Sequence, residues 1–158
     1  MSERIQRHIN EITAAREELF AVLEQVGERG DEQLYSDGAA WTIRQLAIHL
    51  LMADKGHNGM LMTIAAGKEL IPEDYDLERY NKRSVEKNAN MSMANIITAL
   101  KASRAELLDW LNSINDATLD KRGRHATLRV LSLSEILDIV AWHDGTHGKD
   151  IQAHLESA

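Results

Sequence analysis

The segment VAWHDGTHGKDIQAHL, residues 140–155, repeats apolar side chains at helical spacing and carries two histidines four residues apart. In a helix this spacing places His143 and His147 about 40° apart around the axis and one turn apart along it. Both lie near the line of Val140 and Ile151, so they point toward the core. The segment therefore predicts a helix that presents two imidazoles at a spacing suited to one metal ion.

A second segment, WTIRQLAIHLLMAD, residues 41–54, supplies a third imidazole. His49 lies beside Leu46 and Leu50 on the apolar side of the predicted helix. Three converging histidines leave coordination positions open for water or substrate, and neutral imidazole suits Zn, Ni, Fe or Cu. The two segments together predict a metal site made by His49, His143 and His147.

Four amphipathic segments extend this pattern over the chain. Apolar residues recur at helical spacing over residues 5–26, 43–64, 93–114 and 133–155. Thr42 with Gln45 and Ser132 with Glu135 have the spacing of capping boxes at the starts of the second and fourth segments. Each apolar stripe is too narrow for a stable isolated helix, so the sequence predicts an all-α four-helix bundle.

The depths of the histidines predict the order of the helices. His49 lies roughly 9 Å from the start of its helix, and His147 lies roughly 12 Å from the end of its own. These depths match if the second and fourth helices are antiparallel, which gives an up-down-down-up bundle. The long polar link over residues 67–90 makes the crossover, and its middle, DLERYNKRSVEKNA, predicts a short helix. Residues 28–41 and 115–131 are expected to be loops.

Composition limits the class of protein. The chain has 158 residues, 44% hydrophobic and 27% charged, which fits a single globular domain over residues 1–158. A net charge of −7 argues against nucleic acid and anionic membranes as partners. No run of about 18 apolar residues occurs, so the expected location is the cytoplasm and no membrane is expected. With no cysteine, any thiol chemistry needs a thiol from outside the chain.

Other polar residues have competing interpretations. Asp54-x2-His57 and Asp144-x2-His147 imitate the paired carboxylate motifs of a ferritin-like dinuclear site, which would also need Glu18 and Glu106. Arg104 interrupts an apolar stripe and is expected to extend from its edge into water, with pairing to a carboxylate or contact with the pocket as alternatives. A basic cluster is interpreted as a solvated loop or as an anion site, and consists of Lys121, Arg122, Arg124, His125 and Arg129.

The chain resembles the DinB/YfiT-like superfamily. The resemblance rests on the two histidine segments, on Tyr80 and Asn81, and on the helix ITALKASRAELLDWL at residues 97–111, and it covers nearly the whole chain. It implies a four-helix bundle of unusual connection order, frequent dimers, and a divalent metal on three histidines. By position these are His49, His143 and His147, the residues that the spacing had already indicated.

The resemblance also implies a range of functions. Enzymes of this group include thiol S-transferases and a mycothiol-dependent maleylpyruvate isomerase. The expected protein is a homodimer that binds a divalent ion (Zn, Ni, Fe or Mn) and a low-molecular-weight thiol, and that acts on a small electrophilic molecule. Asp144 is a candidate base or partner of a ligand, and the candidates for lining the pocket are Tyr80, Asn81 and Arg83.

Two alternatives keep the same fold. In one, the metal site binds a small electrophile or toxin in a stress response without turnover. In the other, the protein is a structural dimer whose histidines hold no metal and whose interface uses Trp110 and Trp142.

Overall fold

The computed structural model describes residues 1–157 and is dominated by four long helices. These are α1 (Glu3–Glu24), α2 (Ile43–Ala65), α4 (Met93–Ser113) and α5 (Leu133–Ser157). A shorter helix, α3 (Leu77–Lys87), lies in the long link, as expected. The connections contain two 3-10 turns, η1 (Gly27–Asp31) and η2 (Asp116–Asp120), and two short strands, β1 (Arg122–Arg124) and β2 (Val130–Ser132).

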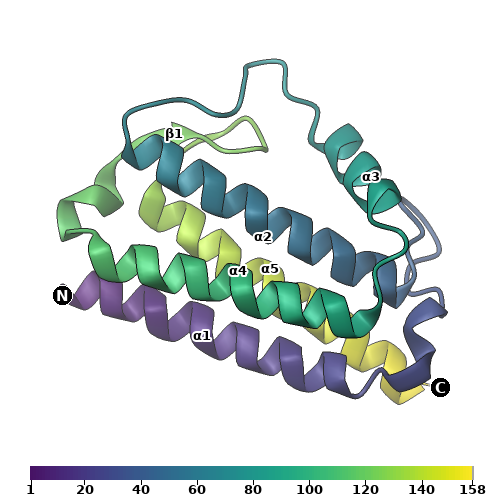
Figure 1. Cartoon of the computed structure of the whole chain (residues 1–158). Coiled ribbons are helices and arrows are strands. Elements are labelled where there is room, and N and C mark those ends of the chain that lie inside the picture. Colours follow the sequence, from purple (N-terminus) through teal and green to yellow (C-terminus); the bar gives the residue numbers. More distant parts are fainter. Residues whose placement is uncertain (158) are drawn as a thin grey trace.

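Figure 1 shows the predicted up-down-down-up order. Helices α1 and α5 run in one direction through the bundle, while α2 and α4 run in the opposite direction. The link between α2 and α4 returns along the top of the bundle in this view and carries α3, which packs on α2. Helices α2 and α5 are in contact and antiparallel. The all-α bundle and the crossover are therefore confirmed.

Side-chain caps fix the starts of the two helices that carry the candidate ligands. The Thr42 hydroxyl accepts from the backbone N–H of Gln45 at 3.1 Å, and the Gln45 side chain accepts from the Thr42 N–H at 3.0 Å. Ser132 and Glu135 make the same reciprocal pair at 3.1 and 3.0 Å. Each cap satisfies N–H groups that a helix start leaves without partners, so it sets the position of every later residue in its helix.

The core consists of two apolar clusters at opposite ends of the bundle. One gathers the end of α1 with the first turns of α2 and α4, and includes Leu23, Leu46 and Ile96. The other gathers the start of α1 with the end of α4 and the start of α5, and includes Ile5, Leu111 and Ile136. Between the two clusters, each long helix carries one buried charged residue, and these four residues are described below.

The segment 115–131 differs from the expected loop. Strands β1 and β2 pair antiparallel with Gly123 opposite Leu131, which forms a small hairpin above the end of α2. A Cβ atom on Gly123 would lie 2.5 Å from Cγ1 of Ile64, so only glycine lets the hairpin lie this close to α2. Three-residue strands are too short for an alternating pattern to show them in the sequence.

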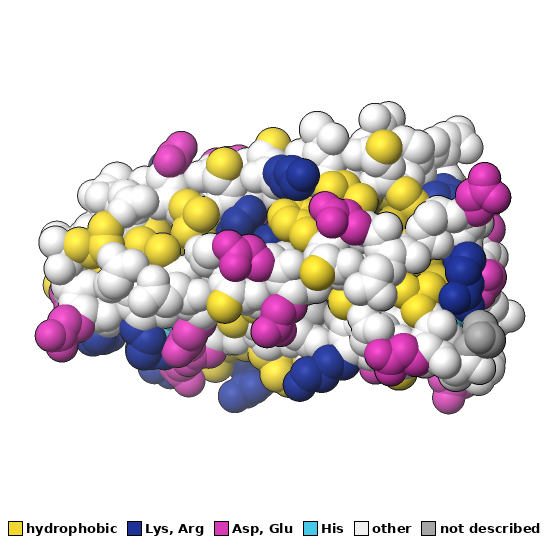
Figure 2. Space-filling model, turned by 90° about the horizontal axis from the view of Figure 1, so that it is seen from below, with side chains coloured by type: hydrophobic (Ala, Val, Ile, Leu, Met, Phe, Trp, Pro, Cys, Tyr) yellow, Lys and Arg dark blue, Asp and Glu magenta, His cyan; other side chains and the backbone are white. Residues whose placement is uncertain are grey.

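The surface carries both signs of charge. On the face seen from below in Figure 2, basic and acidic side chains are interspersed and apolar atoms appear in small separate areas. No part of this face forms a patch of one sign, as expected from a chain without a basic excess. Within residues 1–157, no helix has the length and apolar character needed to span a membrane.

Candidate metal centre

Three histidines from α2 and α5 converge, and they are the three that the sequence predicts. The Nε2 atom of His143 lies 3.1 Å from Nε2 of His49 and 3.2 Å from Nε2 of His147. One ring nitrogen from each residue lies within 4.8 Å of the other two. We call His49, His143 and His147 the histidine triad. The antiparallel contact of α2 with α5 brings His49 close to His143 and His147, which lie one turn apart on α5.

The triad fits a metal ion in both spacing and donor type. Two nitrogens that each lie about 2.1 Å from one ion, at tetrahedral or octahedral angles, are roughly 3.0–3.4 Å apart. The distances from His143 to its two neighbours fall in this range. Three nitrogen donors without a carboxylate or thiolate favour Zn, Ni, Fe or Cu over Mg and Ca. Such a set leaves coordination positions free for water or another ligand.

The triad is uncharged at neutral pH. Burial, followed by the neighbouring histidines, lowers the pKa of His49 to about 4 and that of His143 to about 2. Burial also lowers the pKa of His147. Each ring therefore keeps a lone pair at pH 7, which is the form that binds metal.

Tyr35 and Asp150 orient His147 from behind. The Tyr35 hydroxyl donates its single proton to Oδ2 of Asp150 at 2.5 Å, so toward Nδ1 of His147, at 3.1 Å, it must accept. The Nδ1 atom of His147 then carries the ring proton, and its Nε2 presents a lone pair to the triad. Contacts of this kind fix the tautomer of a metal-binding histidine. Tyr35 comes from the loop before α2, so no periodic pattern in the sequence indicates its position.

Trp41 packs against the ring of His49, the member of the triad on α2. Its ring lies 4.8 Å, centroid to centroid, from the ring of His49, with 33° between the planes. Trp41 directly precedes the capping box of α2, so the cap that starts the helix also places this ring. The indole shields one face of His49 and limits its rotation.

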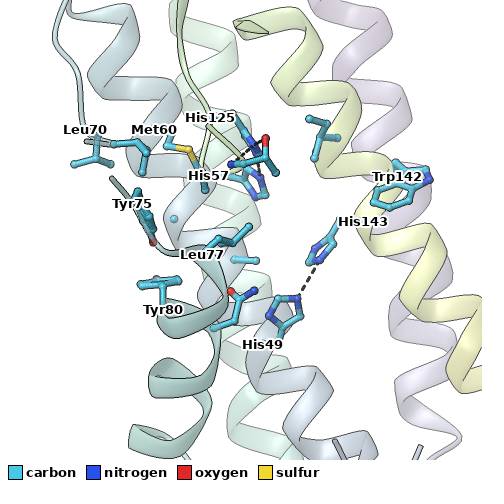
Figure 3. Close-up of a pocket in the computed structure, with 17 residues that line it drawn as sticks. His49, His57, Met60, Leu70, Tyr75, Leu77, Tyr80, His125, Trp142 and His143 are labelled. Carbon is cyan, nitrogen blue, oxygen red and sulfur yellow. Dashed lines mark hydrogen bonds between the residues drawn. The ribbon is translucent and has the colours of Figure 1, made fainter. Parts of the chain in front are cut away.

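A pocket opens beside the triad. Its volume is about 460 Å³, and His49 and His143 form part of its wall, while His147 does not line it. Figure 3 shows α2 and α5 on one side of this pocket and α3 with the link before it on the other. The apolar lining comes from both sides and includes Met60, Leu70, Ile71, Leu77, Ile139 and Trp142. A small molecule in this pocket would contact the open side of the triad.

Two of the three residues predicted to line the pocket do so. Tyr80 and Asn81, both on α3, contribute to its wall. Arg83 faces a neighbouring groove on the outer side of α3, together with Arg79 and Lys87. Tyr80 lies between the two surfaces and contributes to both, but Arg83 is not part of the wall beside the triad.

A second pair of histidines faces the same pocket. His57 on α2 and His125 in the β1–β2 turn meet with their Nε2 atoms 3.0 Å apart, and both are buried. In the sequence, His57 belongs to the ferritin-like motif and His125 to the basic cluster. The structure pairs them with each other, because the hairpin folds over α2. The long separation between them along the chain concealed this contact.

A buried layer of four charges crosses the centre of the bundle, with one residue from each long helix: Arg16, Asp54, Arg104 and Asp144. Arg16 donates to Asp144 at 2.9 Å through Nε and to Asp54 at 2.9 Å through Nη2. Arg104 donates through Nη2 to Asp54 at 3.0 Å and to Asp144 at 3.1 Å. Burial opposes the ionisation of Asp54, but Arg16 and Arg104 outweigh it, so the pKa of this carboxyl is lowered. We call these four residues the charge layer.

The charge layer corrects two expectations. Arg104 does not extend into water from the edge of its helix, because its guanidinium is buried between two carboxylates. The ferritin-like site is also wrong, because Asp54 and Asp144 are bound by arginines and Glu18 and Glu106 are exposed. Asp144 does not line the pocket, and its structural partners are Arg16 and Arg104.

Most of the basic cluster holds the hairpin in place. Lys121 donates to the carbonyl of Ala65, and Arg124 donates to the carbonyl of Ile71 at 2.9 Å. Arg122 donates to the carbonyl of Val130 at 3.1 Å. These side chains attach the hairpin to α2 and to the long link, so they serve the fold and do not gather around an anion.

The remaining histidines make contacts of their own. His154, near the end of α5, lies 3.0 Å from a carboxylate oxygen of Glu32. His8 is buried in α1 and bonds the Ser134 hydroxyl at 2.7 Å, and Glu11 and Asp138 lie close to its other nitrogen. Nη1 of Arg7 forms ion pairs with both of these carboxylates, at 3.1 Å from Oε1 of Glu11 and 3.6 Å from Oδ1 of Asp138. A cationic side chain therefore already occupies the space beside His8.

Comparison with known proteins agrees with this arrangement. The family model of the DinB superfamily matches residues 11–151. The solved structure of YfiT from Bacillus subtilis, described as a probable metal-dependent hydrolase with an unusual four-helix bundle topology, superposes with a TM-score of 0.76. The two sequences are 20% identical, and the match covers 97% of this chain and 87% of YfiT.

A second solved structure has the same fold within a longer chain. The mycothiol-dependent maleylpyruvate isomerase superposes with a TM-score of 0.79 at 15% identity, over 96% of this chain and 63% of the isomerase. No curated protein matches the sequence. At these identities the two structures establish the shared fold.

Proposed function

This chain belongs to the DinB superfamily, and from that premise we propose that it is a divalent-metal enzyme acting on small electrophilic molecules. The reaction type is S-transfer or a related addition, with a low-molecular-weight thiol as the nucleophile. The observation that carries the proposal is the convergence of three neutral imidazoles at the wall of a pocket. An ion held there would lower the pKa of a thiol or water and so supply a nucleophile at neutral pH.

The residues of the chain have distinct parts in this proposal. His49, His143 and His147 hold the ion, and the Tyr35 hydroxyl keeps Nε2 of His147 directed at it. The apolar wall excludes water from the reacting groups. Tyr80 and Asn81 offer polar contacts to a bound molecule from α3. The chain has no cysteine, so the thiol arrives as a separate molecule.

The relatives support a metal and a thiol to different degrees. YfiT is described as a probable metal-dependent hydrolase, which supports an ion in this fold. The isomerase depends on mycothiol, which supports a small thiol as the co-substrate. A non-catalytic protein that binds an electrophile at the same site is the second candidate, favoured by an apolar wall that suits retention of a ligand.

The first test measures metal content. Untagged protein purified without chelators is compared by mass spectrometry with the His49→Ala/His143→Ala variant, and with His154→Ala as a control outside the triad. We expect about one ion per chain in the parent and the control, and little in the double variant. No ion in the parent, even after soaking with Zn, Ni and Mn, would refute the proposal and favour structural histidines.

The second test separates turnover from binding. Metal-loaded protein is mixed with monochlorobimane and each of several thiols, and conjugation is followed by fluorescence. Acceleration that requires both the metal and the triad supports the enzyme. Metal binding without acceleration for any thiol and electrophile pair supports the binding protein.

We also propose that the protein forms a homodimer. Trp142 on α5 is 63% exposed at the mouth of the pocket, which is unusual for a tryptophan in an isolated chain. Sedimentation of the parent beside Trp142→Glu tests this, and a parent that sediments as a monomer refutes it.

A further inference from the structure

The histidine pair, His57 and His125, lies on the wall of the pocket apart from the triad. The two rings are stacked, with centroids 5.2 Å apart and 24° between their planes. The His57 centroid lies 6.4 Å from that of His143. Figure 3 shows the pair and two members of the triad, His49 and His143, at two places along the wall of one pocket. A small molecule in the pocket would therefore contact both.

The hydrogen bonds around His125 place its proton. The backbone N–H of Thr127 donates to Nδ1 of His125 at 3.2 Å, so this nitrogen accepts and carries no proton in the neutral ring. The ring proton of His125 is then on Nε2, where it meets Nε2 of His57 at 3.0 Å.

The same contact assigns the proton of His57. Because Nε2 of His125 donates, Nε2 of His57 accepts and presents a lone pair, so a neutral His57 ring carries its proton on Nδ1. Burial lowers the pKa of His125 to about 4, so its ring is neutral at pH 7. The pair thus offers one N–H donor, on His125, at the wall of the cavity.

The remaining lining determines the charge of the ligand. None of the described residues that line this pocket is Lys, Arg, Asp or Glu. An ion in the pocket away from the triad would lose its hydration without an oppositely charged partner, which costs several kcal/mol in an apolar site. The cavity of about 460 Å³ lies in the range of pockets for small organic ligands. The ligand that fits is uncharged and largely apolar.

We propose that the histidine pair binds the carbonyl oxygen, or an equivalent neutral acceptor, of an uncharged, mostly apolar small molecule. The oxygen shares the His125 N–H with Nε2 of His57 in a three-centre hydrogen bond, so the lone pair of His57 keeps its partner, and the apolar body of the ligand lies against Met60 and Leu77. This proposal specifies the class of substrate that the pocket beside the triad accepts, and it therefore rests on the proposed function. Nothing in the binding step itself requires the metal.

Three probes of nearly equal size test the proposal: acetophenone, which carries the carbonyl, α-methylstyrene, in which a CH₂ group replaces the oxygen, and benzoate, which carries a charge. Dissociation constants are measured by NMR titration on the full chain, with and without one equivalent of Zn²⁺. In both forms we expect acetophenone to bind roughly five- to tenfold more tightly than α-methylstyrene, the value of one neutral hydrogen bond. In the zinc-free protein we expect benzoate to bind more weakly than acetophenone.

Variants of His125 locate the effect. In His125→Leu we expect the ratio of the two neutral probes to fall to about one, since no donor remains. His125→Gln keeps an N–H donor near the position of Nε2 and should retain part of the preference. His154→Leu, which alters a histidine outside the pocket, should leave the ratio unchanged. Circular dichroism melting shows whether each variant is folded.

Several outcomes overturn the proposal. It fails if the neutral probes bind the parent equally, if neither binds, if the preference survives in folded His125→Leu, or if benzoate binds most tightly without zinc. Should His125→Leu not fold, histidine side-chain NMR of the parent decides, because acetophenone must shift the Nε2 signal of His125 and leave that of His154 in place. Normal zinc binding without a ketone preference refutes the subsite alone, and a ketone preference without zinc binding refutes the metal enzyme alone.

Discussion

The charge layer and the histidine triad both take polar side chains from the packed faces of α2 and α5, yet these side chains have different partners. In the charge layer, the oxygens of Asp54 and Asp144 are bound by two arginines. In the triad, uncharged nitrogens of three histidines face one another beside a pocket. His143 and Asp144 are consecutive in the chain, about 100° apart around the helix, so one step of rotation separates the two environments.

This difference shows how burial alone fails to identify a functional residue. A buried carboxylate whose partners lie within the protein is satisfied and contributes to the fold. Buried imidazoles that present lone pairs to one point and border a pocket remain able to bind something further. The carboxylates of the charge layer are therefore paired within the protein, whereas the triad presents donors that a ligand can use.

The largest effect is expected from Asp144→Ala. It leaves Arg16 and Arg104 with one carboxylate between them, and an unbalanced buried charge costs about 3–5 kcal/mol of the free energy of unfolding. Urea denaturation measures this loss, with His154→Ala as a control at a partly exposed site. A loss below about 1 kcal/mol would mean that the layer is open to water, and the contrast with the triad would disappear.

Removing all four charges sharpens the same point. Arg16→Met, Asp54→Leu, Arg104→Met and Asp144→Leu together replace the layer with apolar side chains, and much of the stability lost in the single variant should return. If the quadruple variant is folded, its metal content should stay at about one ion per chain, because the triad is intact. Loss of metal from a folded quadruple variant would show that the layer also positions the triad.

The next effect concerns the hairpin that brings His125 to the pocket. Gly123→Ala places a methyl group 2.5 Å from Ile64, and such overpacking typically costs about 1–3 kcal/mol. Gly145→Ala is the matched control, because a Cβ atom there meets nothing within 4 Å in the interior of α5. This second change should stabilise the protein by about 0.5–1 kcal/mol through helix propensity. Equal urea midpoints for the two variants would show that the hairpin is not held tightly on α2.

Tyr35→Phe tests the support of the triad. It removes the group that accepts from Nδ1 of His147, and losses of such partners lower metal affinity about 10- to 100-fold. Competition with a chromophoric chelator measures the dissociation constant for Zn²⁺. Tyr75→Phe is the control, because Tyr75 lines the pocket elsewhere and its ring packs against that of Tyr80. An affinity change below about threefold would remove Tyr35 from the metal centre.

The fold and the triad could be predicted from local periodicity and helix depth. The apolar stripes gave the four long helices, and the depths of His49 and His147 gave the antiparallel pairing of their helices, which required the crossover. Capping boxes at Thr42 and Ser132 fixed two boundaries. All of these signals lie within single helices or follow from the geometry of one helix beside another.

The rest depends on contacts between distant segments. Arg16 and Arg104 appear in the sequence as polar interruptions of apolar stripes, and only the packed bundle shows that each meets Asp54 and Asp144. Tyr35 and His125 come from connections without periodicity, so nothing in the sequence indicates that one supports the triad and the other faces its pocket. Charge neutrality offers the one available signal, since two arginines and two aspartates at similar depth in four helices can neutralise one another.

The smallest effect concerns pH and His125 in the zinc-free protein. Burial and the neighbouring His57 lower the pKa of His125 to about 4, while in the unfolded chain it is near 6.5. Between these values the unfolded chain binds a proton that the folded protein does not, so the free energy of unfolding falls as the pH is lowered from about 6.5 to about 4. Above about pH 7 both states are neutral at this ring and the contribution is constant.

Urea denaturation of the parent and of His125→Gln across this window tests the effect. The difference between their free energies of unfolding should change by about 1–2 kcal/mol with pH, because the other titrating groups are common to both proteins. A difference that does not vary with pH would mean that the ring is hydrated in the folded protein. The pocket wall would then be polar at this position, whereas the hydrogen bonds of His125 indicate an N–H donor that is shielded from water.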